Sequence, residues 1–190
     1  MGRWEPGAQE RLVGAATELF LDRGFDMTTV ADIANRAGVT ERTFFRYFAD
    51  KREVLFGNPK TYNTVFTDAI ADTPAGATPL EAVAAALQAA GSFFAGRHEG
   101  ARIRQRIIDA NPALQEREQI KRLRLTEAIA SALQARGTPE AAARLTAELG
   151  TVAFHHAFAR WVASIEDDAD LGALALAVLR ELRDLSGLSE

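Results

Sequence analysis

Residues 28–51 read TTVADIANRAGVTERTFFRYFADK, and this stretch decides the fold of the chain. Apolar residues recur at helical spacing over residues 30–37, and Gly38 then ends the segment because glycine adopts a left-handed backbone at little cost. Thr40 is a typical cap for a second helix that ends near residue 48. Two short helices joined by a glycine-containing turn form a helix-turn-helix, whose second helix can enter the major groove of DNA.

A longer amphipathic segment precedes this stretch. It begins near residue 7 and ends at Gly24, and its apolar residues recur with the spacing of one helix face. Phe44 and Phe48 lie four residues apart and supply a matching apolar face on the later helix. We therefore predict a three-helix unit over residues 1–50, in which Phe45 is exposed.

The rest of the chain predicts only helices. Two start signals, at residues 78–81 and 138–140, combine a capping threonine with a proline at the first helical position. We also expect a break at residues 57–59, where glycine and proline interrupt a helix. No segment shows the alternating β-branched pattern of a strand. The sequence predicts an all-α chain of about nine helices, with the N-terminal helix-turn-helix unit followed by a larger helical bundle over residues 51–190.

Composition excludes several classes of protein. The 190 residues include no cysteine, which excludes disulfides and thiolate metal sites and fits a reducing cytoplasm. His155 and His156 are adjacent, so on a helix they point about 100° apart and do not form a zinc-binding pair. We find no phosphate loop, nucleophile elbow, secretion signal or membrane-spanning run. We expect no catalytic site, no metal and no cofactor.

The charge of the chain does not by itself indicate nucleic-acid binding. The formal net charge is −4, and residues 1–55 carry eight basic and nine acidic side chains. Positive charge is local instead, because Arg42, Arg46, Lys51 and Arg52 fall within eleven residues. Screening acts over about 8–10 Å at physiological salt, so such a cluster can still bind phosphate.

The spaced residues of the N-terminal third follow a family pattern. In order along the chain they are Leu19-Phe20, Gly24-Phe25, Thr28-Thr29-Val30, Ile33-Ala34, Ala37-Gly38-Val39-Thr40, Thr43-Phe44-Phe45, Tyr47-Phe48 and Lys51. Over residues 10–56 this pattern resembles the TetR family of transcriptional regulators. The resemblance implies a homodimer that places one recognition helix per subunit in the major groove of a palindromic double-stranded operator. It also implies a C-terminal domain that binds a small molecule and releases the DNA.

Two departures from the family pattern concern the DNA contacts. Arg42 stands where many members have a small residue, and Phe45 stands where tyrosine is common. Arg42 and Arg46 share a helix face, and each can grip guanine with two hydrogen bonds or contact only phosphate. Phe45 can stack on sugar or a thymine methyl, and Thr43 can contact that methyl or a phosphate, or serve only the structure. The operator preference of the family therefore does not transfer to this chain.

The remaining DNA contacts are expected at phosphate. The resemblance implies phosphate contacts from Tyr47 and Lys51, whereas Thr28 or Thr29 offers a hydroxyl and helix N-terminal N–H groups, or is a simple cap. The predicted DNA-binding residues are Thr28, Thr29, Thr40, Arg42, Thr43, Phe45, Arg46, Tyr47 and Lys51.

Large apolar side chains mark the second domain, and they line either a ligand cavity or an ordinary packed core. The candidates for binding a largely apolar effector are Phe66, Ile70, Phe93, Phe94, Ile103, Ile107, Phe154, Phe158 and Trp161. Arginines over residues 102–124 form solvated helix faces or meet an anionic ligand group such as an acyl-coenzyme A phosphate. The last two predicted helices either form a four-helix bundle with those of a second subunit or close the core of the monomer. Candidates for that bundle are Leu145, Leu149, Val152, Trp161, Leu174, Val178 and Leu182.

These residues bear on three possible functions: a repressor, an enzyme and a protein-interaction module. A cytoplasmic, ligand-responsive repressor fits the helix-turn-helix and the large second domain. An enzymatic function has no support, because the sequence contains no recognisable set of catalytic residues. A protein-interaction module that reuses the helix-turn-helix differs from the repressor in salt dependence, because phosphate binding weakens steeply with added salt.

Overall fold

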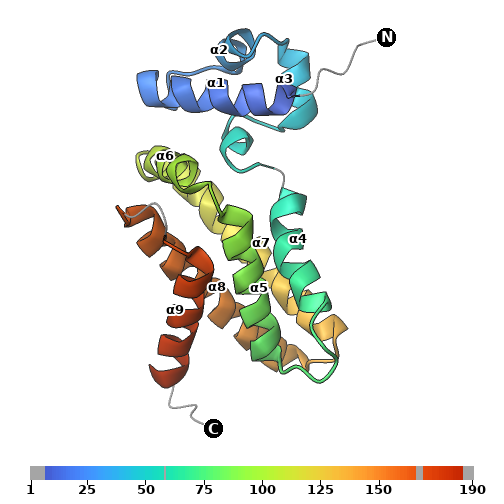
Figure 1. The fold of residues 1–190 in the computed structure, drawn as a ribbon. Helices are drawn as coiled ribbons and strands as arrows, with labels where there is room; N and C mark the ends of the chain where they lie inside the picture. The colour runs from blue at the N-terminus through green and yellow to red at the C-terminus, as the bar shows by residue number, and fades with distance from the viewer. Residues whose placement is uncertain (1–6, 58, 166–168, 186–190) are drawn as a thin grey trace. The chain divides into compact units, whose positions relative to one another are not determined.

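A computed structural model describes residues 7–57, 59–165 and 169–185. Across these residues the chain forms nine α-helices and one short 3-10 helix, without strands, which confirms the predicted all-α class (Figure 1). The elements are α1 (Ala8–Arg23), α2 (Val30–Arg36), α3 (Glu41–Tyr47), η1 (Arg52–Leu55), α4 (Pro59–Ala71), α5 (Pro79–Phe94), α6 (His98–Asp109), α7 (Pro112–Ala135), α8 (Glu140–Ala163) and α9 (Leu171–Leu185).

The helices belong to two compact units. The first unit contains the described residues up to Gly57 together with Ile103–Glu118, and the second contains the remaining described residues. Both α6 and α7 therefore contribute residues to each unit. The predicted functional boundary near residue 50 stays a prediction, because compactness alone does not assign function.

The first unit is built on the predicted three-helix core. The inward side chains of α1, α2 and α3 are joined there by residues from the corner between α6 and α7. The fully buried members of this core, each at most 1% exposed, are Leu12, Ala16, Ile33, Phe44, Val54, Ile108 and Leu114. Burying each large apolar side chain contributes about 1.5–3 kcal/mol, so this corner is an integral part of the first unit.

Polar contacts around η1 reinforce that core. Asp50 caps this turn, since its Oδ1 accepts the N–H groups of Arg52 and Glu53 at 2.8 and 3.2 Å. The buried Glu53 carboxylate pairs with the Arg117 guanidinium. Arg104 donates to the carbonyl of Leu55 at 2.8 Å. The segment after α3 is thus a 3-10 turn held by arginines of α6 and α7.

The second unit surrounds a core of α5, α8 and α9 side chains together with residues of α4 and α7. The start signal at Thr78 works as predicted, because its hydroxyl accepts the N–H of Glu81 at 3.2 Å while Glu81 accepts the N–H of Thr78 at 2.7 Å. Helices α5 and α9 approach closely at a pair of glycines. A Cβ atom placed on Gly91 would lie 2.5 Å from the backbone nitrogen of Gly172. Only glycine at residue 91 allows this approach.

Candidate nucleic-acid interface and effector pocket

Helix α3, the second helix of the helix-turn-helix, has a defined outer side. Its cap is Thr40, whose hydroxyl accepts the N–H of Thr43 at 3.2 Å. Phe44 and Phe48 are buried, whereas the intervening Phe45 is 55% exposed, which confirms the predicted orientation. The two buried rings anchor the short helix, and everything on its other side is available for contact.

Two cations stand on that outer side. Arg42 and Arg46 are exposed, and Thr43 and Tyr47 beside them are half-buried. The Arg46 guanidinium lies 4.9 Å from the centre of the Tyr47 ring and donates to its hydroxyl at 3.2 Å. Cation–π contact and this hydrogen bond hold Arg46 and Tyr47 as a pair. The arrangement offers two positive donors on one turn of a helix that is otherwise anchored by its core.

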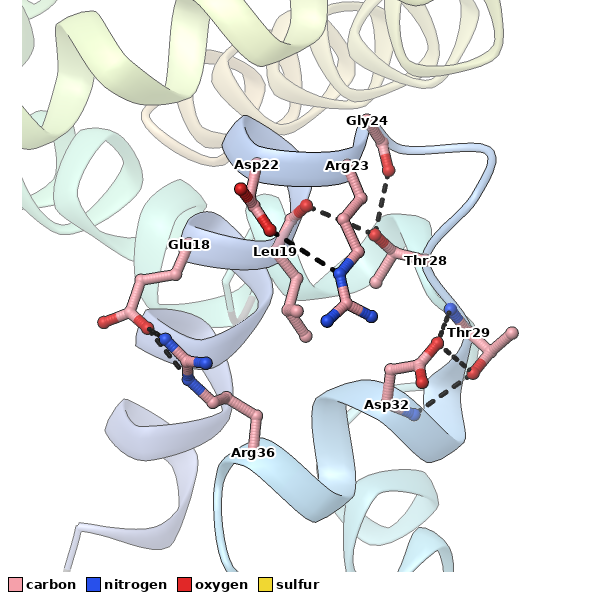
Figure 2. Close-up of polar contacts among 9 residues, drawn as sticks. All are labelled: Glu18, Leu19, Asp22, Arg23, Gly24, Thr28, Thr29, Asp32 and Arg36. Atoms are coloured by element: carbon pink, nitrogen blue, oxygen red, sulfur yellow. Dashed lines mark hydrogen bonds and ion pairs between the residues drawn. The ribbon is translucent and has the colours of Figure 1, made fainter.

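The N-terminus of α2 is closed by its own carboxylate (Figure 2). Oδ2 of Asp32 accepts the N–H of Thr29 at 2.9 Å and its hydroxyl at 2.6 Å, and the Thr29 oxygen accepts the N–H of Asp32 at 3.1 Å. Hydrogen bonds from the Thr29 hydroxyl, and then from its N–H, lower the pKa of the Asp32 carboxyl. Thr29 is therefore the cap, and a negative charge already occupies the helix end where a phosphate would bind.

Thr28 and Lys51 turn inward rather than outward. Thr28 is buried, and its hydroxyl donates to the carbonyls of Gly24 at 2.8 Å and Leu19 at 3.4 Å (Figure 2). Nζ of Lys51 donates to the carbonyls of Phe25 and Thr28 at 2.6 and 2.7 Å. Burial lowers the pKa of the Lys51 ammonium, which the charge of Asp26 offsets only in part. Both side chains thus fix the loop before α2, and their predicted phosphate contacts stay a prediction.

Sequence reasoning missed the contacts that place α2 on α1. Arg36 donates to the carboxylate of Glu18 at 2.7 and 3.1 Å (Figure 2). Nε of Arg11 donates to the carbonyl of Ala37 at 3.1 Å. These partners lie 18 and 26 residues apart in the sequence, so no local spacing signals them. They fix the segment that leads into the turn before α3.

Most of the predicted effector residues form one packed group. We define the aromatic cluster as Tyr62, Phe66, Phe94, Phe154, Phe158 and Trp161, whose neighbouring ring centres lie 5.2–6.4 Å apart. Ile70 is buried in the same core. The Phe93 ring centre lies 5.2 Å from that of Phe94, and the Arg97 guanidinium lies 4.3 Å from the Phe93 ring centre. Ile103 and Ile107 pack in the core of the first unit instead. The cluster is core, and those two isoleucines are not part of it.

A cavity of about 680 Å³ lies beside the aromatic cluster rather than inside it. Its walls come from α5, the segment after α5, the end of α8 and the start of α9. Phe94 and Trp161 are the two predicted effector residues that line it. Its volume is within the range of about 300–1,000 Å³ typical of small-molecule sites.

The polar residues of the cavity were not predicted. Gln88, Ser92, His98 and Asp170 line it. Nε2 of His98 donates to the carbonyl of Trp161 at 2.8 Å, and Nε1 of Trp161 donates to the carbonyl of Ala169 at 2.8 Å. The four polar residues come from α5, from α6 and from the segment before α9, so no periodic pattern in the sequence could have grouped them.

The predicted dimer residues divide into two sets. Leu145 is 64% exposed on α8, and Leu149 and Val152 follow it as half-buried residues. Leu174 and Leu182 are half-buried on α9. Trp161 and Val178 are buried in the core of the second unit. Leu145 is therefore the exposed member of the α8 stripe over residues 145–152, whereas Trp161 and Val178 close the core of their own chain.

The described part of the chain contains no group of three or more histidine, aspartate or glutamate side chains arranged to hold a metal ion. None of its helices combines the length and the apolar character needed to cross a membrane.

Comparison with known proteins places the first unit in a family. Residues 12–56 match the family model for bacterial regulatory proteins of the tetR family. The transcriptional regulator TcmR of Streptomyces glaucescens is 36% identical over 112 residues, which cover 56% of this chain and 50% of that protein. The regulator MftR of Mycobacterium tuberculosis is 31% identical over 115 residues, which cover 60% of this chain and 58% of that protein. The chain thus spans about half the length of these curated relatives.

Solved structures agree on the fold along most of the chain. FadR of Thermus thermophilus, a TetR-family transcriptional repressor solved in complex with lauroyl-CoA, is similar with a TM-score of 0.56 and 24% identity. The match covers 92% of this chain and 92% of that chain. This likeness concerns the arrangement of helices, including those beyond residue 56.

Proposed function

We propose that this chain, which belongs to the TetR family of bacterial regulatory proteins, is a sequence-specific DNA-binding transcriptional regulator. We further propose that it is a repressor that a small molecule releases from its operator. The observation that carries the proposal is the outer side of α3, where Arg42, Phe45 and Arg46 are exposed while Phe44 and Phe48 anchor the helix.

The outer side of α3 supplies the base contacts in this proposal. An arginine can donate two hydrogen bonds to O6 and N7 of guanine, which discriminates bases by about 1–3 kcal/mol. Arg42 is assigned this role, and Arg46, held against Tyr47, reads a base or the adjacent phosphate. Phe45 is assigned contact with a sugar or a thymine methyl. Thr40 and Thr43 at the start of α3 complete the set, since helix N-termini bind phosphate.

Other predicted residues position this surface. Thr29 is assigned a phosphate contact through the helix end that it caps, which requires phosphate to approach the Asp32 carboxylate. Lys51 and Thr28 hold the loop before α2 and are assigned no direct DNA contact. Local positive charge thus comes from α3, which agrees with a chain whose overall charge is negative.

The partner surface in this proposal is the stripe over residues 145–152 of α8. Leu145 is exposed there, and a second copy of the chain is the partner that would bury it. Two recognition helices on a palindromic operator give affinity that one short helix rarely supplies. We propose a cytoplasmic homodimer without enzymatic activity, because its relatives are transcriptional regulators.

The DNA-binding part is tested by selecting genomic fragments with the purified protein and measuring affinity for the selected operator as salt is raised. We expect Arg42→Ala to weaken operator binding by about 1–3 kcal/mol and to relax base preference at one position. Arg144→Ala, which removes an exposed arginine from α8, is the matched control and should leave affinity unchanged. Equal effects of the two substitutions would contradict the assignment of α3 as the reading helix.

A further inference from the structure

The cavity beside the aromatic cluster has a distinctive charge. Among the residues that the structure describes, no lysine or arginine lines it, whereas the Asp170 carboxylate does. Asp170 is exposed at the start of α9, and its Oδ1 accepts the N–H groups of Gly172 and Ala173 at 2.8 and 3.2 Å. The positive end of α9, which would attract an anion, is therefore already capped by a carboxylate.

The opposite wall adds partial negative charge. Helix α5 ends at Phe94, and residues of its last turn line the cavity. The carbonyl groups at a helix C-terminus favour a cation by about 0.3–1 kcal/mol. The cavity wall also includes Trp161 and Phe94, and aromatic rings attract organic cations through their quadrupole. The carboxylate, the helix end and the rings all favour the same sign of charge.

The walls also set the size and shape of the ligand. Gly91, Gly96 and Gly172 are part of the lining. A Cβ atom on Gly96 would meet nothing within 4 Å, whereas Gly91 and Gly172 are glycines because α5 and α9 pack closely there. A volume of about 680 Å³ accommodates a fused-ring molecule of drug size. Of the arginines considered for an anionic ligand, Arg104 and Arg117 bind Glu118 and Glu53 in the first unit, and none of the described arginines lines this cavity.

We infer that this cavity binds an apolar, fused-ring organic cation and is the effector site of the chain. The regulatory meaning of the inference rests on the proposed function, but ligand binding itself does not. On this inference the ligand of the chain is a cation rather than an anionic thioester, even though the fold is similar to that of a regulator solved with lauroyl-CoA.

The test is a titration of DNA-free protein with two dyes that share a xanthene ring system, cationic rhodamine 6G and anionic fluorescein, followed by fluorescence anisotropy. We expect rhodamine 6G to bind at micromolar concentration and fluorescein to bind at least tenfold more weakly. Lauroyl-CoA, added as a competitor, should not displace the cationic dye. Stronger binding of fluorescein, or displacement by lauroyl-CoA, would overturn the assigned charge.

Two variants locate the bound dye. Asp170→Asn keeps a capping side chain, so the fold should be retained while rhodamine 6G binds about fivefold more weakly. Ala173→Trp places a large side chain at an exposed position of the lining and should abolish binding. Asp184→Asn, on the exposed last turn of α9, is the control and should bind as the parent does.

Three further outcomes would contradict either the assigned cavity or the proposed function. Unchanged dye binding in Ala173→Trp would place the dye elsewhere and overturn the inference. Absence of rhodamine 6G binding, with dissociation of a dimer in Ala173→Trp, would show that a second copy covers the cavity and would also overturn it. Dye binding in a protein that selects no DNA fragment would contradict the proposed function and leave the cavity assignment intact.

Discussion

Aromatic residues are placed differently in the two compact units. In the first unit Phe44 and Phe48 are buried and the adjacent Phe45 is exposed, so one helix turn separates anchoring from contact. In the second unit the rings gather into the aromatic cluster, and the cavity lies at its edge, lined by Phe94 and Trp161 together with small and polar residues. The candidate binding surface is thus an exposed helix side in one unit and a cavity beside a packed core in the other.

The largest expected effect is the loss of an anchoring ring in the first unit. Phe44 is fully buried, with its ring centre 5.4 Å from that of Phe48. We expect Phe44→Ala to lower the free energy of unfolding by about 3–5 kcal/mol, because the lost transfer free energy and the cavity add. Urea unfolding followed by circular dichroism measures this change.

The adjacent residue gives the matched control. Phe45 is 55% exposed, so Phe45→Ala should change the free energy of unfolding by less than about 0.5 kcal/mol. The same substitution should weaken binding to the selected operator. If Phe45→Ala destabilised the fold as much as Phe44→Ala, the separation of anchoring and contact on α3 would be wrong.

The next effect concerns the second unit, where small residues allow close packing. A Cβ atom on Gly91 would lie 2.5 and 2.6 Å from backbone atoms of Gly172, which no side-chain rotation can relieve. We expect Gly91→Ala to destabilise the protein by about 1–3 kcal/mol through overpacking. Calorimetry should therefore show a lower melting temperature.

Gly100 on α6 is the control for that substitution. A Cβ atom there meets nothing within 4 Å, so Gly100→Ala should stabilise the helix by about 0.5–1 kcal/mol. Opposite signs for two glycine-to-alanine changes in the same unit are the expected result. A neutral or stabilising Gly91→Ala would mean that α5 and α9 are free to separate.

The sequence predicted the exposed residues of the first unit better than the binding site of the second unit. Helical spacing and the glycine at residue 38 determine which side of α3 is exposed, and that prediction was confirmed by the burial of Phe44 and Phe48. In the second unit the prediction selected large apolar residues, and these pack against each other. A cavity depends on where small residues from several helices meet, and residue type alone does not reveal that meeting.

Long-range contacts account for the remaining differences. A lysine near a helix-turn-helix can bind phosphate or backbone carbonyls, and Lys51 binds carbonyls 23 and 26 residues away in the sequence. Ile103 and Ile107 follow the apolar pattern of α6, but the chain passes from one unit to the other within that helix. Periodicity correctly indicates that such residues are buried, but it does not indicate in which of the two cores they pack.

The smallest effects distinguish two copies of one capping motif, Thr29 with Asp32 in the first unit and Thr78 with Glu81 in the second. Hydrogen bonds from the capping threonines lower the pKa of both carboxyls. A lowered pKa in the folded state stabilises the fold above the unfolded pKa of about 4, and this stabilisation is lost as pH falls through the folded pKa. Asp32→Asn and Glu81→Gln should each reduce the loss of stability on acidification below about pH 4.

At neutral pH, substitutions in the two capping motifs should affect DNA affinity differently. Asp32 places a negative charge at the end of α2, next to the proposed phosphate contact of Thr29. We expect Asp32→Asn to raise operator affinity about twofold, because a helix N-terminus freed of a carboxylate attracts phosphate more strongly. Glu81→Gln removes an equal charge from the second unit and should leave affinity unchanged. Equal gains from both substitutions would indicate that net charge, rather than the local closure of α2, limits binding.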